Sequence, residues 1–320
     1  MLINILLFVL GLVLLIKGGD WFVEGATGIA RRFRLPDIIV GATVVSIGTT
    51  LPEVMVSTTG ALSGQGAMAY GNAIGSIICN TALIAAISVT CNPGSVNTRT
   101  MKLPVIFFFV SSAVYCVAAY ALGEFPRWLG IVMLCLFVLY IGLNIRHGLK
   151  NPDEVKEESE GKPRPFLLEL ALLVVGAAVI AVGADLLVDN GTAIAKGLGV
   201  PETVIALTFV ALGTSLPELI TTVTSLRKGH ASLGIGNVIG ANVLNLVLVS
   251  GVSVTLAPFE VPAGKMLFGQ NASLVLDLPL MMAVMVILTL PALFSKKLRR
   301  GQGILLLCIY AGFCVFQFFI

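Results

Sequence analysis

Ten long apolar segments follow one another along this 320-residue chain, and they restrict the possible fold more than any other feature. A helix of about 20 apolar residues crosses the hydrocarbon core of a bilayer. The predicted spans cover residues 2–24, 37–62, 69–91, 103–122, 128–148, 166–195, 202–226, 232–257, 272–294 and 302–320. We therefore expect an all-α polytopic membrane protein with ten transmembrane helices.

The composition supports this expectation, because only 12% of the residues are charged and 57% are hydrophobic. Soluble proteins carry about twice that charged fraction. The first segment has no Lys or Arg before it and no small-residue cleavage site after it, so we expect a retained helix and not a signal peptide. The six cysteines are scattered through apolar segments without metal-ligand spacing, which predicts packing as small hydrophobic residues.

The basic residues predict the orientation of the chain in the membrane. Sixteen of the 20 Lys and Arg residues lie in the loops that follow odd-numbered spans, and three lie in the opposite loops. Cytoplasmic loops carry an excess of Lys and Arg. We therefore expect an integral protein of the cell (inner) membrane, with both termini outside and a cytoplasmic linker at 149–165. The net charge of +3 then reflects these loops, and we expect no nucleic-acid partner.

The chain contains an internal duplication at an offset of 165 residues. Gly18–Thr90 aligns with Gly183–Thr255 without a gap, and 25 of the 73 positions are identical, including Asp, Asn, Pro and Glu positions. The units are residues 1–148 and 166–320. Five spans in each unit place the second copy in the opposite orientation, which predicts two inverted five-helix repeats and an ion site at the membrane midplane.

Two copies of one polar motif lie within apolar spans. The segments "SIGTTLPEVMVS" and "ALGTSLPELITT" place Glu53 and Glu218 in the second and seventh spans. A charged side chain there costs about 2.5–3.5 kcal/mol even on a lenient insertion scale. Pro52 and Pro217 have no N–H for the carbonyl four residues earlier, so we expect both helices to be broken at proline, with carbonyl oxygens freed.

Other oxygen-bearing residues surround each glutamate. Hydroxyl residues recur every three to four positions, so they share its helix face. The third and eighth spans contribute "YGNAIGSIICN" and "IGNVIGANVLN", each with a polar stripe and a Gly-x-x-x-Gly pattern for close helix contact. Each piece alone has a structural explanation, as a kink or a packing contact. Their joint recurrence favours an all-oxygen site for hard cations such as Ca²⁺ and Na⁺.

These motifs, "GTTLPE…GNAIGSIICN" and "GTSLPE…GNVIGANVLN", resemble the two α-repeats of the cation/calcium antiporter superfamily, in its prokaryotic sodium/calcium exchanger branch. The resemblance implies that Glu53 and Glu218 are the central ion ligands. It also implies supporting ligands at Thr49, Thr50, Thr214, Ser215, Ser76 and the main-chain carbonyls of Ser46 and Ala211, with Asn80 and Asn245 lining the middle.

Two positions depart from that family's pattern. Position 241 is Ala where the family usually has Ser, so one hydroxyl of a repeated pair is missing. Asn245 is neutral where some members carry Asp, which argues against K⁺ co-transport. Because Asn80 is also neutral, coupling to Na⁺ is favoured over coupling to H⁺.

We therefore expect a transporter and not an enzyme: an antiporter that exchanges Ca²⁺ for Na⁺ by alternating access, works as a monomer and has no cofactor besides the transported ions. A Ca²⁺/H⁺ exchanger is the nearest alternative, and a passive cation channel is the second. An intramembrane hydrolase with Glu53 and Glu218 as paired acids is a third, but the chain has no H-E-x-x-H or G-x-S-x-G motif.

Overall fold

The computed structural model describes residues 2–150, 164–198, 213–264, 266–267 and 269–317, and these residues are almost entirely helical. The elements of the first unit are α1 (Leu2–Phe33), α2 (Asp37–Val40), η1 (Gly41–Val45), α3 (Ser46–Leu62), α4 (Gly66–Cys79), η2 (Asn80–Ala85), α5 (Ala86–Cys91), β1 (Gly94–Ser95), α6 (Thr98–Leu122), β2 (Glu124–Phe125) and α7 (Arg127–Lys150). Those of the second unit are α8 (Phe166–Gly197), α11 (Leu216–Arg227), α12 (Ala231–Leu244), η5 (Asn245–Ser250), α13 (Gly251–Leu256), β3 (Phe259–Glu260), β4 (Met266–Leu267), β5 (Gln270–Asn271), η6 (Ser273–Asp277), α14 (Leu278–Ser295), β6 (Lys297–Leu298) and α15 (Arg300–Gln317).

Within the described residues, nine helices are long and apolar enough to cross a membrane, which agrees with the expected membrane-protein class. The predicted seventh span, 202–226, is described only from Gly213 onward, so its first 11 residues lie outside the described residues. Helix α6 begins at Thr98, before the predicted start at 103. The reason is a cap: the Asn97 side chain accepts a hydrogen bond from the Arg99 N–H at 3.0 Å, which satisfies one free donor of the first turn.

The expected break at Pro52 is not seen, because α3 continues from Ser46 to Leu62 with Pro52 inside it. One proline removes a single backbone hydrogen bond, and the packed neighbours of α3 hold the remaining turns in place. The irregular turn lies earlier, in the π-helical segment η1. Pro217 falls in the first turn of α11, where its missing N–H would have no partner within the helix.

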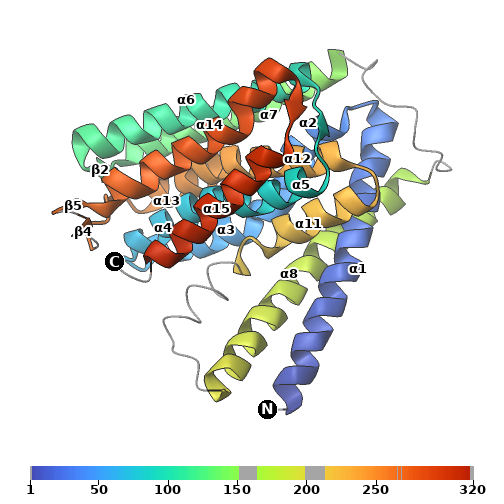
Figure 1. The fold of residues 1–320 in the computed structure, drawn as a ribbon, viewed down its shortest axis with the longest axis horizontal. Coiled ribbons are helices and arrows are strands. Elements are labelled where there is room, and N and C mark those ends of the chain that lie inside the picture. Colours follow the sequence, from blue (N-terminus) through green and yellow to red (C-terminus); the bar gives the residue numbers. More distant parts are fainter. Residues whose placement is uncertain (1, 151–163, 199–212, 265, 268, 318–320) are drawn as a thin grey trace.

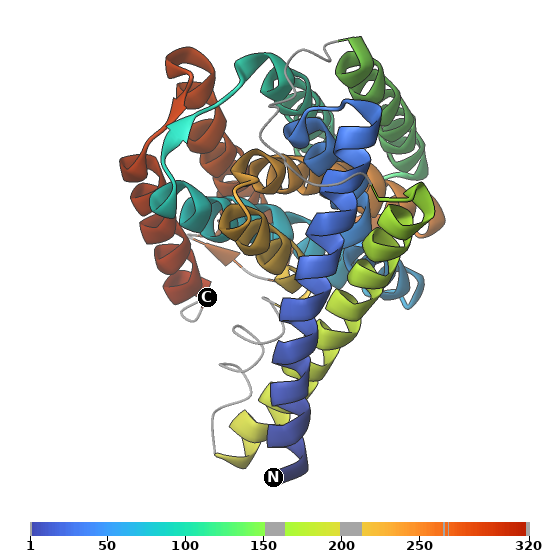
Figure 2. The same ribbon diagram turned by 90° about the vertical axis from the view of Figure 1, so that its right-hand side faces the viewer.

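Helices α1 and α8 lie side by side and cross the remaining helices at a steep angle (Figures 1 and 2). Glycines let their backbones approach closely. A Cβ atom added at Gly11 would lie 2.8 Å from the Gly183 oxygen, and one added at Gly18 would lie 2.9 Å from the Ile180 nitrogen. Small residues at helix contacts are the usual means of close packing in a membrane.

Local structure repeats at the sequence offset of 165. Helices α4 and α12, the π-helical segments η2 and η5, and helices α5 and α13 each begin and end at positions that differ by 165. Two short antiparallel strand pairs then connect the units: β1 pairs with β6, and β2 pairs with β3. These strands were not predicted from the sequence.

Candidate cation site

The two repeated glutamates lie in the interior. Glu53 on α3 and Glu218 on α11 are both fully buried. None of their four carboxylate oxygens has a hydrogen-bond partner among the described residues, and the two carboxylates are close enough to repel each other. A buried carboxylate needs a counter-charge or hydrogen bonds to offset its lost hydration. This pair therefore has the charge and the free oxygens to hold a cation.

Two asparagines stand at the starts of equivalent π-helical segments. Asn80 begins η2 and Asn245 begins η5. Both side chains are fully buried, and neither amide has a partner among the described residues. Single π-helical turns occur frequently at functional sites. Asn80 and Asn245 are thus a matched pair of buried amides without partners among the described residues.

Hydrogen bonds join the two units at equivalent positions. The Thr49 hydroxyl donates to the Asn237 side-chain oxygen at 3.1 Å, and the Thr214 hydroxyl donates to the Asn72 side-chain oxygen at 3.2 Å. Asn72 also donates to the Ser57 hydroxyl at 2.8 Å. Each threonine hydroxyl therefore has an acceptor for its proton, and the lone pairs of its oxygen are left for a cation.

Two asparagines of the candidate site, Asn72 and Asn237, were not among the residues predicted from the sequence. Both lie on the polar stripes of the third and eighth spans, but they were not predicted to be ion ligands. The signal that could have identified them is the repeated Gly-Asn pair, which is identical in the two units.

The remaining predicted residues are placed as follows. Thr50 and Ser215 are buried with hydroxyls that lack a partner among the described residues, and Ser76 is buried on α4. Thr49 and Thr50 lie beside the Glu218 carboxylate. The Ser46 carbonyl accepts a hydrogen bond from Thr49 at 3.4 Å. The Ala211 carbonyl lies outside the described residues.

Helix α12 reaches this site through small residues. A Cβ atom added at Gly240 would lie 2.5 Å from the Ala42 Cα, and one added at Gly41 would meet the Asn237 nitrogen at 2.8 Å. The predicted close contact of the second Gly-x-x-x-Gly pattern is thus confirmed. The equivalent partners of Gly71 and Gly75, near 203–207, lie outside the described residues.

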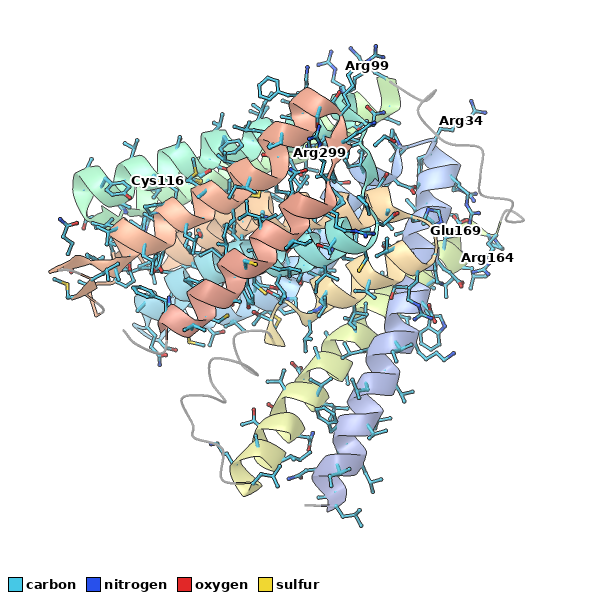
Figure 3. The ribbon with its side chains drawn as sticks, in the orientation of Figure 1. Arg34, Arg99, Cys116, Arg164, Glu169 and Arg299 are labelled. Carbon is cyan, nitrogen blue, oxygen red and sulfur yellow. The ribbon has the colours of Figure 1, made fainter. Side chains whose placement is uncertain are left out.

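Ion pairs connect elements at one end of the molecule. The Lys228 ammonium lies 3.2 Å from Glu24 and 3.4 Å from Asp20 on α1, and Arg164 lies 2.8 Å from Glu24. His230 lies 2.8 Å from Asp37. Asp20 and Glu24 are therefore both paired with basic side chains. In Figure 3, Arg34, Arg99, Arg164 and Arg299 lie in the upper right half, while Cys116 on α6 lies to the left.

Comparison with known proteins shows matches over nearly the whole chain. A family model described as sodium/calcium exchanger protein matches residues 3–146 and 168–319. The sodium/calcium exchanger MaX1 of Methanosarcina acetivorans is 29% identical, with 99% of each chain covered. The inner membrane protein YrbG of Escherichia coli is 33% identical over 96% of this chain and 94% of that protein.

A solved structure shows the same arrangement of helices. It is that of the sodium-calcium exchanger NCX_Mj soaked with zero Na⁺ and Ca²⁺, and it superposes with a TM-score of 0.79 at 29% sequence identity. The alignment covers 97% of each chain.

Proposed function

The chain belongs to the sodium/calcium exchanger protein family, and on that premise we propose that it is a secondary-active antiporter that exchanges Ca²⁺ for Na⁺ by alternating access. The observation that carries the proposal is the pair of fully buried carboxylates, Glu53 and Glu218, with no hydrogen-bond partner among the described residues.

Charge explains why such a site exchanges ions. One Ca²⁺ neutralises both carboxylates, and a set of Na⁺ ions does the same. A site without cations would have to carry two bare carboxylates through a closed, dehydrated state, at a cost of several kcal/mol. The loaded forms therefore switch between the two sides of the membrane, whereas the empty form does not. Coupling of the two fluxes follows from this difference.

The proposed ligands come from both units. Glu53 and Glu218 are shared by all bound ions. Oxygens of the other predicted residues complete the coordination: those of Thr49, Thr50, Thr214, Ser215, Ser76, Asn80 and Asn245, and the carbonyls of Ser46 and Ala211. Asn72 and Asn237 hold two of the threonine hydroxyls in place. Ala241 is fully buried and offers no side-chain oxygen, so the sodium sites of the two units are unequal.

The proposed architecture has ten spans in two inverted repeats, and strand pairing supports the tenth span. Strands β1 and β6 must lie on the same side of the membrane, so an even number of crossings separates them. Five of the long described helices lie between these strands. We propose that the predicted span 202–226 supplies the sixth crossing. The β2–β3 pair and the contact between His230 and Asp37 lead to the same requirement.

The basic residues then set the proposed orientation. The loop regions that contain Arg34, Arg99, Arg164 and Arg299 face the cytoplasm, and both termini lie outside the cell (inner) membrane. All the proposed ligands belong to one chain, so a monomer would be sufficient for transport.

Sodium is the proposed coupling ion. Asn80 and Asn245 are neutral, so the site has no third acid to accept a proton during the cycle. The relatives named sodium/calcium exchangers favour the same choice.

Flux of ⁴⁵Ca²⁺ into proteoliposomes under imposed gradients tests the proposal. We expect uptake driven by an outward Na⁺ gradient and none driven by K⁺. Uptake driven by a pH gradient in Na⁺-free medium would instead identify a Ca²⁺/H⁺ exchanger. Flux without any counter-ion would identify a passive channel.

A further inference from the structure

A buried tyrosine on α7 contacts the irregular turn that leads into the cation site. The Tyr140 side chain is fully buried, and its hydroxyl donates a hydrogen bond to the main-chain carbonyl of Ala42 in η1 at 2.7 Å. Its ring packs against Phe107 of α6, with 5.3 Å between the ring centroids. None of the proposed ligands lies on α7. The contact with η1 therefore has no part in the direct coordination of a cation.

The π-helical turn explains why the Ala42 carbonyl accepts this bond. In a regular α-helix the Ser46 N–H would donate to the Ala42 carbonyl, four residues earlier. In η1 the Ser46 N–H donates instead to the Gly41 carbonyl, five residues earlier. Buried carbonyls need a hydrogen-bond donor. The Tyr140 hydroxyl thus takes the place of the N–H that the π-helical turn withdraws from Ala42.

The backbone held by Tyr140 lies one turn before proposed cation ligands. Ser46 directly follows η1, and its hydroxyl donates to the Thr43 carbonyl at 3.1 Å. The Ser46 carbonyl, a proposed ligand, accepts a hydrogen bond from Thr49 at 3.4 Å. Because Ala42 and Ser46 are separated by about one helical turn, a displacement of the Ala42 carbonyl also displaces the Ser46 carbonyl.

Helix α12 limits the position of the same turn by close packing. A Cβ atom added at Gly240 would lie 2.8 Å from the Ala42 carbonyl carbon and 2.7 Å from the Ser46 hydroxyl oxygen. Packing resists movement toward α12, but it has little directional preference. A hydrogen bond is directional, so the Tyr140 hydroxyl supplies the contact that sets the orientation of the carbonyl.

Helices α7 and α15 correspond to each other at an offset of 173. The segments "RWLGIVMLCLFVLY" (127–140) and "RGQGILLLCIYAGF" (300–313) are identical at five of 14 positions. Their contacts match as well. A Cβ atom added at Gly130 would meet Thr255, and one added at Gly303 would meet Thr90, which is the counterpart of Thr255 in the first unit.

The hydroxyl is present in one unit only. At the offset of 173 the counterpart of Tyr140 is Phe313, which has the same ring without the oxygen and is partly buried. The fold therefore already contains phenylalanine at this place, and Tyr140→Phe should fold. Any effect of this substitution on the cation site reports the loss of the contact with Ala42.

We propose that Tyr140 is a positioning residue of the cation site: its hydroxyl fixes the Ala42 carbonyl and, through η1, the Ser46 carbonyl where a cation binds. The inference rests on the proposed function, since it takes the Ser46 carbonyl as a ligand. Without the hydroxyl, part of the binding free energy is used to order η1, so the cation binds more weakly. A bound cation then holds the Ser46 carbonyl itself, so the maximal rate of exchange stays close to that of the parent.

The first test measures binding and needs no transport. Thermal unfolding of the purified full-length protein is recorded at increasing concentrations of Na⁺ and, separately, of Ca²⁺, because an ion that binds the folded state raises Tm. In Tyr140→Phe a given rise in Tm should require at least about tenfold more of one or both ions, since losing a residue that orients a metal ligand costs about 10–100-fold in affinity. Unchanged requirements for both ions overturn the proposal.

Tyr70→Phe is the matched control. It also removes a buried hydroxyl that donates to a carbonyl, that of Ser273 at 3.2 Å, but η6, which begins at Ser273, contains no proposed ligand. Its requirement for ions should equal that of the parent. An increase as large as that of Tyr140→Phe would mean that general loosening of the fold weakens binding, and the positioning role would be wrong. A purely structural Tyr140 would lower Tm equally at every ion concentration, which also contradicts the proposal.

The second test measures Na⁺-driven ⁴⁵Ca²⁺ uptake into proteoliposomes. In Tyr140→Phe the half-saturating concentration should rise for the same ion that is affected in the first test, while the maximal rate stays close to that of the parent. A lower maximal rate with unchanged half-saturating concentrations contradicts the proposal.

The outcomes are distinct from those of the proposed function. Weakened ion binding in Tyr140→Phe, together with no Na⁺-driven uptake by the parent, overturns the exchange proposal alone. Normal exchange by the parent with unchanged affinities in Tyr140→Phe overturns the positioning role alone. A parent whose Tm responds to neither ion contradicts the cation site, and the positioning role with it.

Discussion

At the scale of single residues, the site is defined by oxygens that lack partners. Glu53, Glu218, Asn80 and Asn245 are all fully buried, and none has a side-chain hydrogen bond among the described residues. In an ordinary protein interior such groups cost about 1–3 kcal/mol each, and more when charged. In the proposed function a bound cation offsets this cost, so each of these residues should be sensitive to loss of charge or of an oxygen.

Neutralising either acid tests the charge argument. Glu53→Gln and Glu218→Gln should each reduce Na⁺-driven ⁴⁵Ca²⁺ uptake to the level of protein-free liposomes, because one remaining carboxylate balances only half the charge of Ca²⁺. Both variants should remain folded, since removal of a buried, unpaired charge does not weaken packing. Size-exclusion profiles and thermal unfolding serve as the controls. Near-normal uptake by either variant would refute the assignment of the central ligands.

Adding an acid tests the preference for Na⁺ over H⁺. Asn245→Asp places a third carboxylate in the site, and three clustered carboxylates do not all ionise easily. One of the three carboxylates should therefore take up a proton near neutral pH. Uptake by the variant should therefore fall more steeply than uptake by the parent between about pH 8 and about pH 6. Identical pH profiles would place Asn245 outside the ion site.

Most of these residues could be proposed from the sequence, because the same polar residues occur at equivalent positions of the two apolar units. Chance similarity between apolar segments would not produce such matches. The sequence was not sufficient for Asn72 and Asn237. Their role depends on which helix of the other unit lies opposite, and the Thr49–Asn237 and Thr214–Asn72 hydrogen bonds exist only after the two units have docked. Spacing along one helix contains no information about a partner on another.

At the scale of elements, the spans were predictable from their apolar length, whereas their irregularities were not. The π-helical segments η1, η2 and η5 have no composition that distinguishes them from regular helix. The end of α1 at Phe33 also differs from the predicted 24, because a helix continues past the hydrocarbon when its last turns are packed against neighbours.

The close contact of α12 with η1 gives a prediction at this scale. Gly240→Ala should lower the free energy of unfolding by about 1–3 kcal/mol, the usual cost of overpacking, because the added Cβ would lie 2.5 Å from the Ala42 Cα. The matched control is Gly312→Ala on α15, where the added Cβ meets no atom within 4 Å among the described residues.

Alanine is the better helix former by about 1 kcal/mol, so the control should be neutral or stabilising. Thermal unfolding of the two purified variants provides the comparison. A stabilised Gly240→Ala would mean that α12 and η1 are not held in close contact.

At the scale of the whole molecule, the strand pairs β1–β6 and β2–β3 tie loops of one unit to loops of the other. The duplication predicted that the units are inverted but gave no contact between them. Two-residue strands are too short to produce a recognisable alternation of apolar and polar residues, so these ties could not be read from the sequence.

The topology is testable with a variant that lacks the native cysteines. Single cysteines are introduced at the C-terminus and within the 149–165 linker, and intact cells are labelled with a membrane-impermeant thiol reagent. We expect labelling of the C-terminal cysteine in intact cells and of the linker cysteine only after the membrane is opened. Labelling of both from the same side would contradict ten spans and, with them, the inverted repeats.

The ion pairs of Lys228 have a consequence for the kinetics of the two membrane faces. Asp20 and Glu24 recur at the repeat offset as Asp185 and Asp189, but the equivalent of Lys228 is Ser63. In an inverted repeat, each unit adopts in the outward-open form the conformation that the other unit has in the inward-open form. Because only one unit has the lysine, the ion pairs of Lys228 would form in only one of the two forms. Partly exposed ion pairs stabilise a conformation by about 0–1 kcal/mol. The form that has the pairs would therefore be up to about fivefold more populated than the form that lacks them.

The less populated form then shows a weaker apparent affinity on its own side, in proportion to its population. Half-saturating Ca²⁺ concentrations measured from the two sides should therefore differ in the parent, and Lys228→Ser should bring them closer together. If Lys228→Ser leaves the difference between the two half-saturating Ca²⁺ concentrations unchanged, the ion pairs of Lys228 do not cause it.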